Sequence, residues 1–192
     1  MNKRLYVAYG SNLNLDQMAM RCPTAKLYGT GKIENYELQF KGRPNGAFAT
    51  IAPKKGSFVP AAVWEIQPRD EWALDQYEGY PSHYFKQNVS VQLDDKTVDA
   101  MVYLMNLKMD FGLPSPHYYR IVYEGYNDCD LDTDILHKAV ENSARQYYSS
   151  FEQSFPQQNM FDDYNQEDYE DEEFENRKGN EMDDTDPFNY SM

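Results

Sequence analysis

Two stretches of alternating side chains in the middle of the chain limit most strongly what it can fold into. In residues 85–93 the apolar side chains, including Phe85, fall on one face and polar side chains lie opposite. In residues 98–105 both faces are apolar except at Asp99 and Tyr103. Side chains alternate across a strand, so the first pattern predicts a half-buried strand and the second a strand buried on both faces. A buried Tyr103 then needs a partner for its hydroxyl.

The rest of the first ~110 residues reads as further short strands separated by turn signals, which is typical of a barrel or sandwich. The candidate strands are residues 5–8, 27–29, 36–40, 47–51 and 62–66. One helix interrupts them, because Pro68 and Asp70 favour its first turn and Gly79 favours its end. Two more helices follow Pro114, one starting at Ser115-Pro116 and one capped by Asp132. The sequence therefore predicts an α+β fold with a strand-rich body.

Acidic charge is concentrated at the end of the chain. Residues 152–192 contain 14 Asp and Glu against 2 Lys and Arg, a net charge of 2 − 14 = −12. Residues 1–151 contain 18 against 16, a net charge of 16 − 18 = −2. We expect a domain over 1–151 and a disordered acidic tail over 152–192, since such a segment buries too little apolar surface to offset its ordering entropy. The aromatic residues of the tail leave open a second interpretation, a segment that binds a protein partner.

Composition also narrows the class of protein. The nearly neutral domain lacks the clustered Lys and Arg of a nucleic-acid interface, so no nucleic acid is expected as a partner. Cys22 and Cys129 are too few for a disulfide framework and suit small, partly buried thiols in a reducing compartment. No apolar stretch of signal-peptide or membrane-span length is present, so a cytoplasmic protein without membrane contact is expected.

The first candidate functional segment is the sequence Tyr-Gly-Ser-Asn-Leu that follows the strand pattern of residues 5–8. A short helix pattern starts at Asp16, so Gly10 and its neighbours must turn the chain between strand and helix. The amides of such a turn point into one small volume and form a nest for a negative group or a polarised carbonyl oxygen. The alternative is an ordinary tight turn in which Asn12 caps the following helix.

The second candidate is Glu78, at the predicted end of the helix that starts near Pro68. The helix dipole favours cations at that end, so a glutamate there is electrostatically unfavourable. The dipole and any burial both raise the pKa of the carboxyl, and a carboxyl with a pKa near 7 can accept and return a proton. The alternative is a solvated surface glutamate.

The order of these motifs resembles that of the γ-glutamylcyclotransferase family. The series is Tyr-Gly-Ser-Asn-Leu, the strand at 46–51, Leu-Asp-Gln-Tyr-Glu-Gly-Tyr-Pro, the strand at 101–105 and Pro-Ser-Pro-His-Tyr. The similarity spans roughly residues 5–134 and leaves the tail outside. It implies a compact mixed β-barrel with flanking helices and one cavity. Ala61 stands where some members of the family have Gly.

The resemblance also implies roles for individual residues. Glu78 matches the catalytic glutamate of the family. The substrate-binding loop and the aromatic lining of the cavity fall on Tyr9, Gly10, Ser11, Asn12, Leu13, Tyr84, Tyr103 and Tyr118.

The implied activity is that of a cyclotransferase. In this reaction the α-amine of a γ-glutamyl amide attacks its own γ-carbonyl, which releases 5-oxoproline and an amine. One carboxyl can move the proton and converging amides can stabilise the oxyanion, so no cofactor or metal is expected. The leaving group stays open between an amino acid, a peptide amine, a lysine ε-amine and another small amine.

Two other interpretations compete with this one. Ser11 as a nucleophile would need a base, but His83, His117 and His137 are scattered along the sequence. A catalytically silent binding protein of the same fold, contacting a partner through its acidic tail, would have no need of Glu78.

Overall fold

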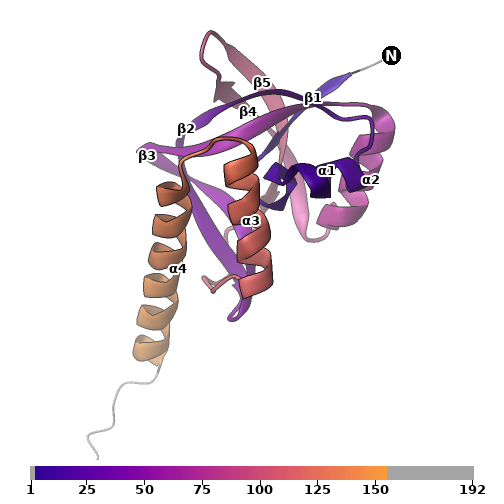
Figure 1. Ribbon diagram of the computed structural model, residues 1–192. Coiled ribbons are helices and arrows are strands. Elements are labelled where there is room, and N and C mark those ends of the chain that lie inside the picture. Colours follow the sequence, from indigo (N-terminus) through magenta and orange to yellow (C-terminus); the bar gives the residue numbers. More distant parts are fainter. Residues whose placement is uncertain (1–2, 155–192) are drawn as a thin grey trace, which may run out of the picture. The chain divides into compact units, whose positions relative to one another are not determined.

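The computed structural model describes residues 3–154, in which five strands close into a barrel and helices cover its outside (Figure 1). The strands are β1 (Arg4–Ala8), β2 (Lys26–Arg43), β3 (Gly46–Ile66), β4 (Tyr84–Gln92) and β5 (Thr97–Met105). The helices are η1 (Ser11–Leu13), α1 (Leu15–Arg21), α2 (Pro68–Glu78), α3 (Pro116–Asp128) and α4 (Thr133–Ser154). The predicted α+β fold, a mixed barrel with flanking helices, is confirmed.

The order of strands around the barrel is β1-β3-β2-β4-β5. Neighbouring strands are antiparallel except where β5 returns beside β1, with Tyr6 opposite Met101 in a parallel pair. Closure removes the free sheet edges that would otherwise expose unpaired backbone groups. It also brings β1 and β5, which are far apart in the sequence, to the same side of the cavity described below.

The strands β2 and β3 are longer than the sequence predicted. The separate candidates at 27–29 and 36–40 are parts of β2, and those at 47–51 and 62–66 are parts of β3. The hairpin passes through a register shift between Glu34 and Tyr36, where Asn35 and Gly56 take left-handed φ angles of 62° and 80°. Gly56 N donates a hydrogen bond of 3.1 Å to Asn35 Oδ1, which fixes the irregularity. In the sequence this irregularity resembles a turn, which is why the parts of β2 and of β3 on either side of it were predicted as separate strands.

The alternating patterns predicted the burial of β5 correctly and that of β4 in part. Every residue from Ala100 to Met105 is buried. Val89 and Val91 of β4 are buried as predicted, but Phe85 is 42% exposed. Phe85 is the second residue of β4. The apolar side chains of this face therefore extend to the start of the strand, but at the start they are not buried.

Asp70 ties the end of α1 to the start of α2. The Asp70 side chain is 1% exposed and accepts hydrogen bonds from Gln67 N (3.0 Å), Thr24 Oγ1 (2.6 Å) and Thr24 N (3.4 Å). The bond from Gln67 N completes a capping box at the first turn of α2. This cluster fixes the two helices that carry Arg21 and Glu78 relative to each other.

Replacing this carboxylate is expected to destabilise the fold. Asp70→Ala leaves three donors without their acceptor, so we expect a loss of about 2 kcal/mol in the free energy of unfolding. Urea denaturation measures it, with Asp16→Ala as the control. Asp16 is an exposed acid in the first turn of α1, and its loss should change stability by less than about 0.5 kcal/mol. Equal stabilities of the two variants would contradict this role.

The helices α3 and α4 form the predicted helical pair, and they lie on a different part of the barrel surface from α2 (Figure 1). Ser115 Oγ accepts a hydrogen bond from Tyr118 N, and Asp132 Oδ1 accepts one from Asp134 N, so both predicted caps are confirmed. Gly125 lets α3 approach the loop after β1, because a Cβ there would lie 2.5 Å from Asn14 N. The close approach fixes Tyr118 beside that loop.

The helix α4 ends at Ser154, so the first three residues of the predicted tail belong to it. The remainder of the predicted acidic tail, residues 155–192, lies outside the described residues. The boundary at 152 and the disorder of the tail stay predictions. Cys22 and Cys129 are both buried free thiols. None of the helices within residues 3–154 is long and apolar enough to cross a membrane.

Candidate functional site

A cavity opens where the loop after β1 meets the end of α2. Its empty volume, counted out to the solvent at its mouth, is about 320 Å³. The lining residues are Tyr6, Val7, Tyr9, Gly10, Ser11, Asn12, Ala49, Glu78, Tyr84, Tyr103 and Tyr118. Of the predicted site residues, only Leu13 is not among them.

The loop after β1 tightens into the 3₁₀ turn η1. Leu13 N donates a hydrogen bond of 2.9 Å to Gly10 O, and the Leu13 side chain lies in the core. The Leu13 amide therefore serves the turn rather than the cavity. The Ser11 amide contacts the hydroxyl of Tyr118 at the cavity wall. The sequence predicted a nest formed by the amides from Gly10 to Leu13, and the Leu13 amide is therefore not part of it.

Asn12 does not cap α1, which corrects the capping role considered from the sequence. The N-cap is Asn14, whose Oδ1 accepts a hydrogen bond from Gln17 N (2.9 Å). The 3₁₀ turn shifts the start of the helix by two residues and turns the Asn12 side chain toward the cavity. There Asn12 Nδ2 donates to Glu78 Oε1 (3.0 Å) and to the hydroxyl of Tyr6 (2.8 Å).

Glu78 is the last residue of α2 and its carboxyl faces the cavity. The helix ends there because Gly79 takes the left-handed conformation, with a φ of 64°. Burial raises the pKa of Glu78 to about 7, while the Arg21 guanidinium and the hydrogen bond from Asn12 act in the opposite direction. Desolvation of the charged form outweighs both stabilising contacts.

The main chain of Ala49 holds two of the cavity tyrosines. Ala49 N donates to the hydroxyl oxygen of Tyr118 (3.2 Å), and the hydroxyl of Tyr84 donates to Ala49 O (3.2 Å). The Tyr118 oxygen thus faces two backbone amides, those of Ala49 and Ser11, and its own proton is left to donate. Tyr118 and Tyr84 are therefore fixed by the backbone of β3.

Tyr103 lines the cavity with its ring and directs its hydroxyl away. The hydroxyl donates a hydrogen bond of 2.6 Å to Asp75 Oδ1, which is the partner that its burial required. The Tyr103 main chain contributes to the other side, since its carbonyl accepts a 2.6 Å bond from the hydroxyl of Tyr9. Its ring meets that of Tyr6 edge to face at 5.8 Å between centroids.

Three residues at the site carried no signal in the sequence. Tyr6 looked like any strand residue, although its hydroxyl accepts from Asn12. Arg21 donates to Asn12 Oδ1 and lies 3.5 Å from the ring centroid of Tyr77. The Tyr77 hydroxyl is 3.0 Å from Ser11 Oγ. An arginine or tyrosine of this kind becomes recognisable only when the fold brings it beside the cavity.

The cavity combines one tunable carboxyl with a set of phenols. Burial raises the pKa values of Tyr6, Tyr9, Tyr84, Tyr103 and Tyr118 above the usual range, so all five stay protonated at neutral pH. Among the lining residues described here, Glu78 is the one carboxyl, and its pKa lies near neutrality. Such a site can move one proton and stabilise a developing oxyanion with hydrogen-bond donors.

Comparison with known proteins places this geometry in a family. Residues 6–127 match the family described as "Gamma-glutamyl cyclotransferase, AIG2-like". The gamma-glutamylcyclotransferases of Bos taurus and Homo sapiens are 29% and 28% identical to the chain over 145 and 144 residues. Each alignment covers 70% of this chain and 76% of the relative.

Solved structures show the same fold. One named gamma-glutamyl cyclotransferase has a TM-score of 0.66 at 28% identity, covering 72% of this chain and 86% of that chain. The structure of YkqA from Bacillus subtilis has a TM-score of 0.64 at 19% identity, over 76% of this chain and 56% of that chain. The family match over residues 6–127 includes every residue that lines the cavity.

Proposed function

The chain belongs to the gamma-glutamyl cyclotransferase, AIG2-like family, and we propose that this enzyme of the cyclotransferase kind cyclises the γ-glutamyl group of a γ-glutamyl amide. The observation that carries the proposal is the Glu78 carboxyl in a cavity walled by the loop after β1, with a pKa of about 7. A carboxyl with that pKa is partly ionised at neutral pH, so it can serve as both base and acid in one turnover.

The proposed reaction needs one proton carrier. Glu78 accepts a proton from the α-ammonium of the substrate, and the freed amine attacks the γ-carbonyl carbon. A new carbon–nitrogen bond closes the five-membered ring, and the amide bond to the leaving group breaks. Glu78 returns its proton to the departing amine nitrogen, then takes the second proton from the ring nitrogen and passes it to the released amine, so the products are 5-oxoproline and an ammonium ion. Atoms and electrons balance without another reactant.

The oxyanion is stabilised by a hydrogen-bond donor that lines the same cavity. We assign this role to the hydroxyl of Tyr118, whose oxygen already faces the Ala49 and Ser11 amides. Backbone amides behind a phenol polarise its O–H bond and strengthen the bond that it donates. Preorganised donors of this kind typically contribute roughly 10²–10³ in rate. Asn12 holds Glu78 in place through its 3.0 Å bond to Oε1.

The loop is expected to act mainly through its backbone. Ser11→Ala removes the hydroxyl contact with Tyr77 and leaves the Ser11 amide, so we expect less than about a tenfold loss of kcat/KM, the effect of one neutral hydrogen bond. Tyr77→Phe removes the same contact from the other side and is the matched comparison. Complete loss of turnover in folded Ser11→Ala, together with a trapped acyl-serine, would instead identify Ser11 as a nucleophile.

The identity of the leaving amine can be found with a panel of substrates. We suggest γ-glutamyl-alanine, γ-glutamyl-cysteinylglycine, ε-(γ-glutamyl)lysine and γ-glutamyl-ethylamine, with 5-oxoproline release as the readout. Each represents one class of leaving group that the chemistry permits. The proposal expects 5-oxoproline from at least one. Release from none would favour the catalytically silent alternative.

A further inference from the structure

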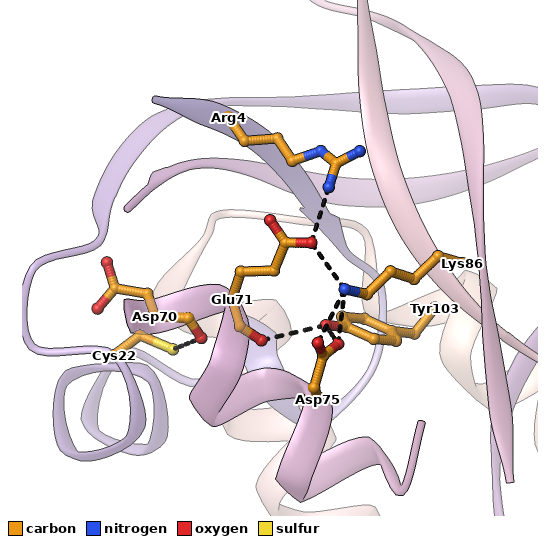
Figure 2. Close-up of polar contacts among 7 residues, drawn as sticks. All are labelled: Arg4, Cys22, Asp70, Glu71, Asp75, Lys86 and Tyr103. Atoms are coloured by element: carbon orange, nitrogen blue, oxygen red, sulfur yellow. Dashed lines mark hydrogen bonds and ion pairs between the residues drawn. The ribbon is translucent and has the colours of Figure 1, made fainter. Parts of the chain in front are cut away.

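A network of charged residues joins α2, the helix that ends at Glu78, to β1 and β4 (Figure 2). Asp75 of α2 bonds to Lys86 Nζ of β4, at 2.7 Å from Oδ1 and 2.9 Å from Oδ2. The same Lys86 Nζ lies 2.7 Å from Glu71 Oε1, and Glu71 is also paired with Arg4 of β1 at 2.7 Å. The Lys86 side chain is only 18% exposed, so solvent screens its inner contacts weakly.

Asp75 makes both side-chain and main-chain contacts that bear on the end of α2. Its carboxylate accepts the hydroxyl proton of Tyr103 at 2.6 Å, as Figure 2 shows. Its carbonyl oxygen accepts hydrogen bonds from Gly79 N and Tyr80 N, which close the last turn of the helix. Glu78 lies within that turn, three residues after Asp75. The position of the Glu78 backbone therefore depends on where Asp75 is held.

A second set of contacts reaches Glu78 from the cavity side. The ring of Tyr103 packs against that of Tyr6, and the hydroxyl of Tyr6 accepts from Asn12, which in turn donates to Glu78. Tyr103 is therefore linked to Glu78 in two ways: its hydroxyl bonds to Asp75 of α2, and its ring packs against Tyr6 within the cavity.

We propose that Asp75, held by Lys86 and Tyr103, is a positioning residue that sets the place of Glu78 in the cavity. The kinetic part of this inference rests on the proposed function. The contacts themselves do not depend on the identity of the substrate. Because the Tyr103 hydroxyl is bonded to Asp75, it acts on the reaction through Asp75 and α2, while the ring of Tyr103 forms the cavity wall.

The variant that isolates this contact is Tyr103→Phe. It removes the bond to Asp75 and the longer contact of the hydroxyl with Glu71 O (3.5 Å), while keeping the ring and leaving every charge in place. The matched control is Tyr126→Phe, since Tyr126 is buried in α3 and its hydroxyl has no hydrogen-bond partner among residues 3–154. Asp75→Asn tests the other end of the contact, and the double variant measures whether the two changes act through one interaction.

The first readout is titration of Glu78 by ¹³C NMR in the substrate-free protein. In the wild type, burial holds the pKa of Glu78 at about 7. Loosening the last turn of α2 admits water, so the pKa in Tyr103→Phe should fall toward 4.5, the ordinary value, and that in Tyr126→Phe should not. The groups that face Glu78 from the neighbouring elements are Arg21, Tyr6, Tyr9, Tyr84 and Tyr118, and neither variant changes them.

The second readout is the kinetics of 5-oxoproline release from the best amide of the panel. A misplaced catalytic group costs turnover more than binding, so Tyr103→Phe should lower kcat roughly tenfold and change KM by less than about twofold. The double variant should lose about as much as Asp75→Asn alone, because the Tyr103 hydroxyl acts through the Asp75 carboxylate that this change has already replaced.

The outcomes separate the positioning role from the proposed function. If Glu78 had the same pKa in Tyr103→Phe as in the wild type, and the kinetics of Tyr103→Phe matched those of Tyr126→Phe, the positioning role would be overturned. A raised KM with additive losses would also overturn it, because the hydroxyl would then be contacting substrate. If the wild-type protein released no 5-oxoproline, the proposed function would fail, and the titration alone would decide the role of Asp75.

Discussion

Glu78→Gln is expected to lower kcat by roughly 10²–10⁴, the usual contribution of a general acid–base group. Gln keeps the shape of the side chain and can still contact Asn12, but it does not accept the ammonium proton at neutral pH. Steady-state kinetics of 5-oxoproline release measure the effect. KM should change far less than kcat, because the Ser11 amide and the Tyr118 hydroxyl are untouched.

The same variant should fold well, and its stability should depend on pH in a defined direction. The folded-state pKa of Glu78 is raised from 4.5 to about 7, so the folded protein holds this proton more tightly than the unfolded chain. The stability contributed by Glu78 is therefore fully present below pH 4.5 and is lost as the pH rises through 7. Gln does not ionise, so the Tm of Glu78→Gln should rise relative to that of the wild type as the pH increases from 4.5 to about 7, and the difference should then level off. A parallel pH dependence of the two Tm values would contradict the raised pKa.

Gly10→Val is expected to lower kcat/KM roughly 10²-fold, the largest loss after that of Glu78→Gln. A Cβ at Gly10 would lie 3.2 Å from the hydroxyl of Tyr118 and 3.3 Å from Ala49 Cβ, which is closer than ordinary packing. The two methyl groups of valine would displace the phenol that we assign to the oxyanion. Kinetics on the folded variant provide the measurement.

Gly29→Val provides the matched control for the loop. Gly29 lies in β2, and a Cβ there would meet Leu93 Cδ1 at 3.7 Å, an ordinary contact. Because Gly29 does not line the cavity, this change should leave kcat/KM within about threefold of the wild type. Equal losses in the two variants would mean that the effect of Gly10→Val reflects general destabilisation rather than displacement of Tyr118.

Local patterns predicted the parts of this fold that local physics controls. The alternation over 98–105 predicted a strand buried on both faces, and the unusual polar residue Tyr103 predicted the need for a partner. Proline and glycine at the ends of α2 predicted its boundaries, because each favours one backbone conformation. The likeness to a family then assigned Glu78 and the loop, and the structure brings them to one cavity.

The features that the sequence did not reveal depend on contacts between distant residues. Arg21 and Tyr77 belong to different helices and meet because the fold packs α1 beside α2, where Asp70 of α2 also holds Thr24. Asn14 caps α1 in place of Asn12 because the 3₁₀ turn of residues 11–13 precedes the helix, and no periodic pattern in the sequence marks that turn. The link between Asp75 and Tyr103 spans 28 positions and follows from closure of the barrel.

The most direct test of the account is the pH dependence of kcat/KM for 5-oxoproline release, measured for the wild type and for Glu78→Gln. In the free enzyme this parameter reports the ionisation of the essential groups. We predict that the wild-type profile rises through a pKa of about 7 to a plateau, and that the residual activity of Glu78→Gln lacks this limb. A wild-type profile that is flat across this range, or a variant that keeps both the limb and near-wild-type turnover, would show that Glu78 is not the proton shuttle.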